Sequence, residues 1–211
     1  MRKFLLLILT VAIATPTFAQ FETNRSRSRY NHNDTESYYG LRLGLNVSSL
    51  SSNIAEYDMN AYAGLSFGGV YGLQLANSAP VWLEAGLFFS QKGGRSEYNN
   101  EEVKCRMNFL QVPVVCKYTV EAADDLFLAP FIGGYLACGV GGKTKNYATR
   151  NSVSSFDNVN RWDAGLRIGC GLEYQMVYGE FGFDFGLANL SKDDFQHVRT
   201  RNLFVNVGVN F

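Results

Sequence analysis

The chain has 211 residues, with 19 Lys and Arg against 19 Asp and Glu, so its formal net charge is zero. This length suits one domain, or at most two, and a chain without excess positive charge is not expected to bind nucleic acid. A hydrophobic fraction of 46% argues against a globally disordered protein, and no apolar run is long enough for a membrane-spanning helix.

The N-terminal part of the chain predicts two segments that precede the folded domain. A short positive start is followed by the apolar run 4–13, and small residues at positions 17 and 19 suit a cleavage site. This order is typical of a secretory signal peptide, which we place at residues 1–19. Residues 20–37 are polar and lack periodicity, so they predict a flexible leader. The protein is therefore expected to be exported.

From residue 38 to the C-terminus, apolar residues alternate with small or polar ones. In the segment 161–174, for example, Leu166 and Ile168 alternate with Gly165 and Arg167. Because successive side chains of a strand point to opposite faces, a period of two predicts strands with one apolar face. In the segment 126–140 both the odd and the even positions are largely apolar, so the sequence does not show which of these side chains point outward. We predict eight strands, within residues 39–48, 64–75, 81–90, 110–118, 126–140, 161–174, 180–187 and 202–211.

The strand lengths and the connections between them predict a membrane barrel. Strands of ordinary globular proteins average about five or six residues, whereas a tilted strand needs about ten to cross a bilayer. Short connections alternate with longer polar ones, the longest being 141–160, as in outer-membrane barrels with short periplasmic turns. We predict an all-β fold, an eight-stranded antiparallel up-and-down transmembrane β-barrel over residues 38–211, with both termini in the periplasm.

The direction of the apolar face separates a membrane barrel from a soluble one. A soluble periplasmic barrel that binds an apolar ligand would turn this face inward. The opposite face is rich in glycine and carries few charges, which suits a narrow lumen better than a water-facing surface. Because a buried charge without a partner is costly, the charges on this face are expected to pair in the lumen. The predicted lumen charge network consists of Arg42, Glu84, Lys117, Asp163, Arg167 and Glu173.

Aromatic residues gather near the predicted strand ends, where membrane barrels carry aromatic girdles. A general preference of aromatic residues for strands accounts for part of this pattern. The candidate girdle residues are Tyr38, Tyr39, Trp82, Tyr118, Trp162, Tyr174 and Tyr178. The chain ends in Phe211, and a C-terminal aromatic residue of this kind resembles the insertion signal of bacterial outer-membrane barrels.

No catalytic, cofactor-binding or metal site is predicted. Four cysteines without a CxxC pair and only two histidines give little support for a metal site. A disulfide between Cys105 and Cys138 stays open, although their parity suggests opposite faces. A catalytic arrangement of Ser191, Asp194 and His197 would lie in a loop, which holds a nucleophile and its base poorly. We therefore predict no enzymatic activity and no cofactor.

Five segments of the chain are distinctive: YGLRLGLNVSSL from Tyr39, FLQVPVVCKY from Phe109, GLRIGCGLEY from Gly165, FGLANL from Phe185, and the terminal VNVGVNF. Together they resemble the PorT-like outer-membrane β-barrel family of Bacteroidetes-type bacteria, over about residues 38–211. The resemblance implies an outer-membrane barrel, but the family has no single activity to carry over. Members often have an arginine–aromatic pair in the seventh strand; Gly182 and Phe183 take that place here, so one inward cation is missing.

The sequence thus predicts an integral protein of the bacterial outer membrane, without enzymatic activity. Its long surface loops would serve interactions or an accessory role in the envelope or in secretion. A small-solute channel and a soluble periplasmic barrel with an apolar ligand remain as alternatives. Expected partners are outer-membrane lipid, the barrel-assembly machinery during insertion and a protein at the external loops; no nucleic acid is expected, and the protein is predicted to be a monomer.

Overall fold

The computed structural model describes residues 36–52, 59–76, 79–98, 101–146, 152–156, 159–191 and 198–211. All of them belong to the second of the two units into which the chain divides, Asp34–Phe211. The predicted signal peptide and nearly all of the predicted leader lie outside the described residues, so both stay predictions. No helix within the described ranges is long and apolar enough to cross a membrane.

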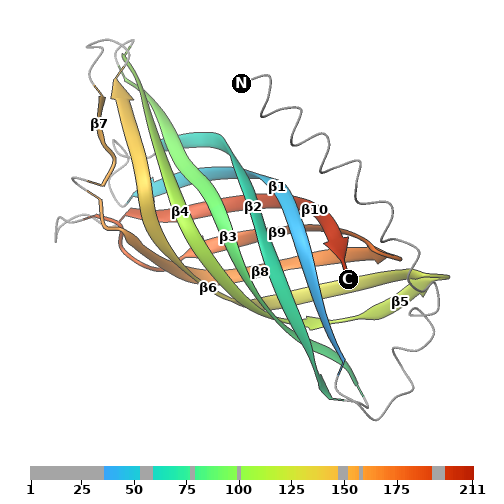
Figure 1. Ribbon diagram of the computed structural model, residues 1–211. Coiled ribbons are helices and arrows are strands. Elements are labelled where there is room, and N and C mark those ends of the chain that lie inside the picture. The colour runs from blue at the N-terminus through green and yellow to red at the C-terminus, as the bar shows by residue number, and fades with distance from the viewer. Residues whose placement is uncertain are drawn as a thin grey trace, which may run out of the picture. The chain divides into compact units, whose positions relative to one another are not determined.

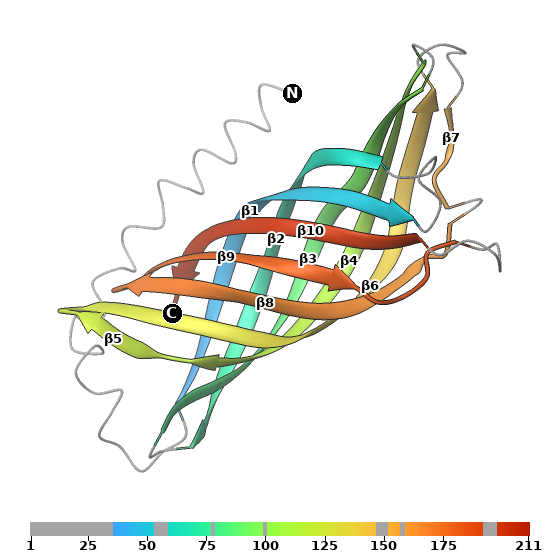
Figure 2. The ribbon, with the colours of Figure 1, turned by 180° about the vertical axis from the view of Figure 1, so that it is seen from behind.

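The described chain forms one antiparallel sheet, which closes on itself. Its strands are β1 (Ser37–Ser52), β2 (Met59–Ala76), β3 (Ala79–Tyr98), β4 (Glu101–Tyr118), β5 (Val120–Ala123), β6 (Leu126–Asn146), β7 (Ser152–Ser154), β8 (Trp162–Tyr174), β9 (Val177–Gly186) and β10 (Val198–Asn210). The eight long strands form the wall, and the pairing of β4 with β6 closes it (Figure 1, Figure 2). The predicted eight-stranded antiparallel barrel is confirmed.

The two short strands extend the long ones. β5 keeps the register in which β4 pairs with β6, so it continues β4 past Thr119, and β7 pairs with the far part of β6. We call the end of the barrel with Ser37, Phe211 and the tight turns the turn end, and the opposite end the loop end. The turns after β2, β5 and β8 lie at the turn end, and the longer connections after β1, β6 and β9 lie at the loop end.

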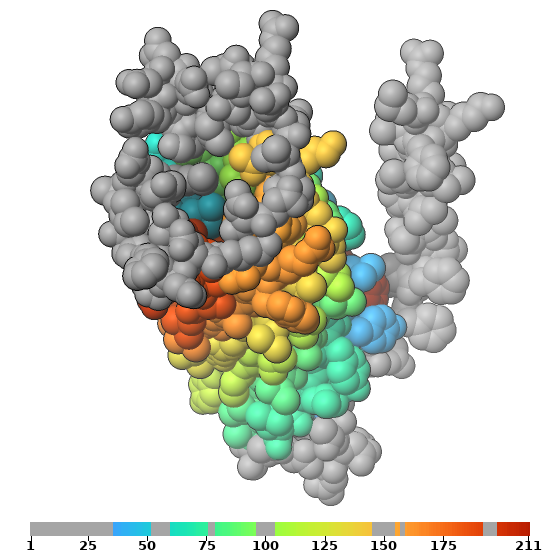
Figure 3. Space-filling view, turned by 90° about the vertical axis from the view of Figure 1, so that its left-hand side faces the viewer, coloured from blue at the N-terminus to red at the C-terminus, as the bar shows by residue number. Residues whose placement is uncertain are grey.

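The apolar face of the sheet points outward. Leu43 is 59% exposed and Leu166 is 52% exposed, as are the equivalent positions on the other wall strands. In the segment 126–140 Ile132 is exposed, whereas Phe131 and Tyr135 are buried inside the barrel. Figure 3 shows one face of this wall, on which side chains of successive strands pack side by side. An apolar exterior around a charged interior is the reverse of a soluble barrel with an apolar ligand, so that alternative is wrong.

The strands at the loop end reach further than the apolar alternation predicts. β3 runs to Tyr98 and β4 begins at Glu101, so most of the connection between the predicted strands 81–90 and 110–118 is a hairpin. β6 likewise continues to Asn146, into the predicted loop 141–160. Beyond the apolar band the alternation on β4 is reversed, with polar residues outward and the apolar residues Met107 and Phe109 inward. The backbone ladder therefore continues although the outward apolar pattern ends.

Pro113 lies inside a barrel strand and interrupts the ladder on one side. Its side chain is buried in the interior, and it pairs with Tyr135 of β6. On the other side, β4 pairs with β3 at Ala85 and at Phe88 but not at the two residues between them. Proline has no N–H to donate, so it is tolerated in a strand where the ladder is broken locally.

The prediction of an aromatic girdle is wrong for part of its residues. Tyr39 and Trp162 are outward and more than half exposed, as are Tyr118 and Tyr174. Tyr38, Trp82 and Tyr178, in contrast, are buried inside the barrel. They occupy positions of the small-residue face, where inward glycines leave room for them: a Cβ atom on Gly72 would collide with the Tyr38 ring, and one on Gly171 with the Tyr178 ring.

Candidate functional site

The candidate site is the barrel interior, because ionisable side chains gather there. Among the described residues, four cations and four anions are buried: Arg42, Lys92, Lys117, Arg167, Glu84, Asp163, Glu180 and Asp184. Five of the six residues of the predicted network lie in this set. The sixth, Glu173, is half-buried near the turn end, where its Oε2 accepts a hydrogen bond from Asn210 Nδ2 at 3.1 Å.

Sequence reasoning missed Lys92, Glu180 and Asp184, although the parity of each strand places all three inside. Lys92 continues the inward series of β3 by one step beyond Ser90, just past the end of the predicted strand 81–90. Glu180 and Asp184 alternate with the phenylalanines of β9 and could have been included by parity alone. Including every charged residue of the inward parity, and extending the inward series of β3 by one step, would therefore have completed the network.

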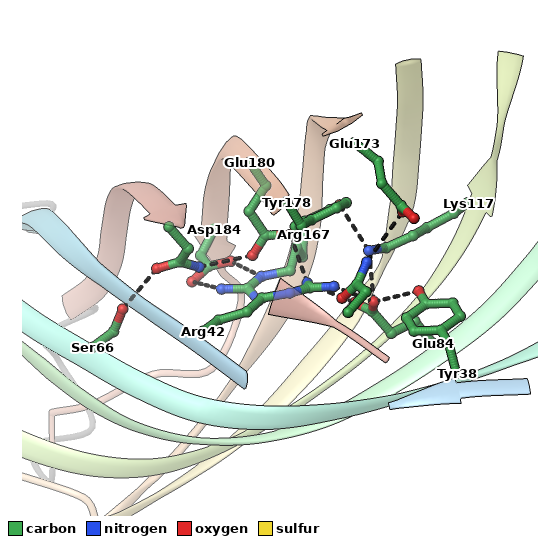
Figure 4. A network of polar contacts seen from close by, with 12 residues as sticks. Tyr38, Arg42, Ser66, Glu84, Lys117, Arg167, Glu173, Tyr178, Glu180 and Asp184 are labelled. Carbon is green, nitrogen blue, oxygen red and sulfur yellow. Dashed lines mark hydrogen bonds and ion pairs between the residues drawn. The ribbon is translucent and has the colours of Figure 1, made fainter. Parts of the chain in front are cut away.

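Glu84 is the centre of the charges near the turn end. Both of its carboxylate oxygens accept hydrogen bonds from Arg42, one at 2.9 Å from Nη1 and the other from Nη2. Lys117 Nζ donates to Oε2 at 2.7 Å, and the Tyr38 hydroxyl donates to the same oxygen. Figure 4 shows these side chains converging from β1, β3 and β4. One buried carboxylate thus pairs with two buried cations.

The second anion of this group, Glu180, connects Arg42 to a chain of polar side chains. Arg42 Nη1 donates to Glu180 Oε2 at 2.8 Å, and Asn206 Nδ2 donates to the other oxygen at 2.8 Å. Ser66 Oγ in turn donates to Asn206 Oδ1 at 2.8 Å. The Arg42 guanidinium also lies 4.1 Å from the centre of the Tyr178 ring. We call Arg42, Lys117, Glu84 and Glu180 the turn-end cluster; its formal charges cancel.

A second group of four charges lies nearer the loop end. Arg167 Nε donates to Asp184 Oδ1 at 2.7 Å, and Gln111 Nε2 donates to Oδ2 at 3.1 Å. Lys92 Nζ lies 3.7 Å from Asp184 Oδ2 and 3.8 Å from Asp163 Oδ2. Thr200 Oγ1 donates to Asp163 Oδ2 at 2.8 Å. We call Lys92, Arg167, Asp163 and Asp184 the loop-end cluster, and its formal charges also cancel.

Two stacked aromatic rings lie between the clusters. The Phe131 and Phe204 ring centres are 6.4 Å apart, and both side chains are buried with Val115. Arg167 of the loop-end cluster lies 4.0 Å from the Phe204 ring centre, and Lys117 of the turn-end cluster lies 5.5 Å from that of Phe131. The aromatic pair therefore separates the two charged clusters along the barrel.

The loop end of the interior is closed by apolar side chains. This apolar cap consists of Leu50, Cys105, Met107, Phe109, Tyr135, Ala137, Phe156 and Leu190. Phe156 and Leu190 come from the connections after β7 and β9, and the Phe156 ring packs edge-on against Phe109 at 5.8 Å. Sequence reasoning missed the cap. Phe156 and Leu190 belong to irregular connections, which carry no periodic signal, and the other six residues lie on the inward face of β1, β4 and β6, where small or charged residues were expected.

Among the side chains that the structure describes, the interior offers hydrogen bonds and charge but no recognisable catalytic arrangement. Within the described ranges, no group of three or more His, Cys, Asp or Glu side chains could hold a metal ion. Asp194 and His197 of the loop arrangement considered above lie outside the described residues. Cys105 is a free thiol buried inside, and Cys138 is a free thiol of the outward parity on β6, which agrees with the opposite faces that the parity suggests.

Replacing Tyr178 with Phe should lower the free energy of unfolding by roughly 1.5 kcal/mol. The Tyr178 hydroxyl accepts a hydrogen bond from Lys117 Nζ at 2.8 Å, and a buried hydrogen bond to a charged group is worth at least this much. We expect a loss at the lower end of the range for hydrogen bonds to charged groups, because Lys117 keeps its ion pair with Glu84. Urea unfolding of the protein in lipid vesicles measures the change. The exposed Tyr174→Phe is the matched control, and an equal effect of both variants would contradict the expectation.

Comparison with solved structures finds other outer-membrane barrels. Ail, the attachment invasion locus protein of Yersinia pestis, is 14% identical over 83% of this chain and 99% of its own, with a TM-score of 0.44. Neisserial surface protein A is 14% identical over 85% of this chain and 100% of its own, with a TM-score of 0.49. The N-terminal β-barrel domain of Pseudomonas aeruginosa OprF is 14% identical over 81% of this chain and 97% of its own, with a TM-score of 0.35.

Comparison of the sequence with known families gives a broader assignment than the PorT-like resemblance. No curated protein matches the sequence. The family described as "Outer membrane protein beta-barrel domain" matches residues 14–192, which is most of the chain and includes every wall strand except β10. The chain therefore belongs to the outer membrane protein β-barrel domain family.

Proposed function

We propose that this protein is a monomeric, non-conducting outer-membrane barrel that presents binding loops at the cell surface and has no catalytic role. The observation that carries the proposal is the filled interior. Two neutral charge clusters, an aromatic pair between them and an apolar cap occupy the inside of the barrel. Such an interior supports a rigid scaffold better than a path for solutes.

The loop end has the features of a binding surface on a rigid support. Loops that carry function are typically held by a rigid framework, and three of the four connections at this end are longer than the turns at the other. The longest connection, after β6, is rich in Ser, Thr and Asn, which suits polar contact with a partner. An accessory role in the envelope or in secretion is compatible with the resemblance to PorT-like barrels and would give this binding its setting.

The channel alternative requires an opening through several layers of side chains. A solute entering from the loop end would first meet the cap around Phe109, then the charges around Asp184, then the ring of Phe204. Eight-stranded barrels are narrow enough for side chains to fill them. The interior therefore favours the non-conducting proposal over the channel.

Planar bilayer recordings test the closed interior. We expect purified wild-type protein to give no conductance steps, because the cap and both charge clusters block the lumen. Glu84→Ala and Arg167→Ala, which remove buried groups from the two clusters, serve as variants that would widen any existing path. Steps in the wild type that grow in these variants would overturn the proposal in favour of a channel.

Epitope insertion tests the direction of the loops. An epitope placed within residues 147–151, after β6, should bind antibody on intact cells. The same epitope at the turn after β8, between Gln175 and Met176, should bind only after the outer membrane is opened. The reverse pattern would contradict a role of the loops at the cell surface, even if the barrel proved non-conducting.

A further inference from the structure

The outer surface of the barrel is charged asymmetrically. At the loop end, outward cations lie on β3, β4 and β6, which are neighbours in the wall. At the turn end, the exposed charges of the β5 hairpin are Glu121, Asp124 and Asp125. We call Arg95, Lys104, Arg106 and Lys143 the basic patch. All four residues lie at outward positions of the sheet, and Arg95, Arg106 and Lys143 are exposed.

The register of the strands sets these cations directly opposite one another. Arg95 on β3 is opposite Lys104 on β4, and Arg106 on β4 is opposite Lys143 on β6. Like charges at directly opposite positions of an antiparallel pair repel and are destabilising. Arg106 and Lys143, the pair nearer to the membrane, therefore form a surface that an anion would stabilise.

On the membrane side of the basic patch, no described side chain of the protein provides such an anion. Among them, no carboxylate lies on the outer face of β3, β4 or β6. Between the patch and the apolar band stand uncharged residues, Gln91 on β3 and Asn108 on β4. The acidic register pair Glu97 and Glu102 lies further out, beyond Arg95 and Lys104. The pair nearest to the membrane, Arg106 and Lys143, thus faces the lipid headgroups across a neutral gap.

The height of the patch matches the headgroup layer. Leu110 is the outward apolar residue of β4 nearest to the loop end, and Arg106 lies four positions before it, further towards the loop end. At about 3.3 Å per residue and a tilt of about 40°, Arg106 lies roughly 10 Å above Leu110. The polar layer of a bilayer is about 5–8 Å thick on each side, and a long Arg or Lys side chain can bend down to reach it.

We propose that the basic patch binds the phosphate groups of a phosphorylated lipid in the outer leaflet. Guanidinium groups bind phosphate through paired charge-assisted hydrogen bonds, and a lysine beside them adds a point charge. A lipid rather than a soluble anion is the occupant because the patch borders the apolar band on its membrane side. The lipid acyl chains would then lie on the outward apolar residues of the same strands, such as Leu110 and Leu136.

Titration with bisphosphorylated lipid A tests this site. Wild-type protein in neutral detergent should bind lipid A about thirty-fold more tightly than Arg106→Gln with Lys143→Gln, since each cation near an anionic lipid contributes about five-fold. Lys143→Gln alone should bind about five-fold more weakly than wild type. Heat-modifiable gel migration establishes that each variant is folded.

A matched control separates a local site from a general attraction. Arg199 and Arg201 are also exposed near the loop end, but they lie on β10 opposite Ser51 and Ser49. Arg199→Gln with Arg201→Gln removes the same charge and should leave the affinity for lipid A unchanged. An equal loss in both double variants would overturn the site, because it would show only diffuse attraction. Displacement of lipid A by an equal amount of inorganic phosphate would overturn the assignment to a lipid.

Discussion

Replacing Glu84 with Gln should lower the free energy of unfolding by about 3 to 5 kcal/mol, which is the range for breaking a buried ion pair by removing one partner. Gln has nearly the same size as Glu, so the effect comes from charge and not from a cavity. Arg42 and Lys117 would remain buried, with Glu180 as the remaining carboxylate of their cluster. Urea unfolding in phosphatidylcholine vesicles, followed by tryptophan fluorescence, measures the loss.

Two further variants show whether the loss arises from unpaired charge. Glu121→Gln changes an exposed glutamate of β5 and should leave the stability unaltered. Glu84→Gln combined with Lys117→Gln should be more stable than Glu84→Gln alone, because Arg42 and Glu180 then remain as a balanced pair. A double variant no more stable than the single one would contradict an electrostatic origin.

The division of the interior charges into two neutral groups explains why they can be buried. Moving an ion from water into a protein is expensive, and its partner compensates only when the geometry satisfies the remaining hydrogen bonds. In the turn-end cluster, Glu84 accepts four such bonds from three neighbours. The interior is therefore held in one arrangement by contacts that link β1, β3, β4 and β9.

The facing of most residues could be predicted from the sequence, because a period of two assigns each side chain to one side of the sheet. Arg42, Lys117 and Arg167 lie inside, as the parity of their strands predicts. The facing of 126–140 could not be predicted, because Phe131 and Ile132 are both apolar and differ only in their surroundings. Phe131 faces the interior beside Phe204, and Ile132 faces outward.

The partners of the charges could not be predicted, because they depend on how the sheet closes. Arg42 and Glu180 are separated by 138 positions, and they meet only because β10 stands between β1 and β9 in the wall. The apolar cap was equally hidden, since Phe156 and Leu190 belong to irregular connections. Alternation determines the side on which a residue lies, whereas register and closure determine what it touches.

Replacing Leu43 with Arg should lower the free energy of unfolding in a bilayer by about 2 to 4 kcal/mol, the cost of a cation on the lipid face at the bilayer midplane. Leu43 is 59% exposed on the outer face of β1 and lies at the centre of the outward run from Tyr39 to Val47. Unfolding by urea in vesicles measures the cost. The same substitution on a water-exposed sheet would be close to neutral.

A depth control makes this test specific for the membrane. Val47 is also outward on β1 but lies at the end of the run, so Val47→Arg should cost only about 0 to 1 kcal/mol, the range near the interface. Both substitutions add the same charge to the same strand and face, so the effect of net charge cancels in the comparison. Because the expected difference arises from distance to the bilayer centre, equal costs at Leu43 and Val47 would mean that the apolar band does not lie in hydrocarbon.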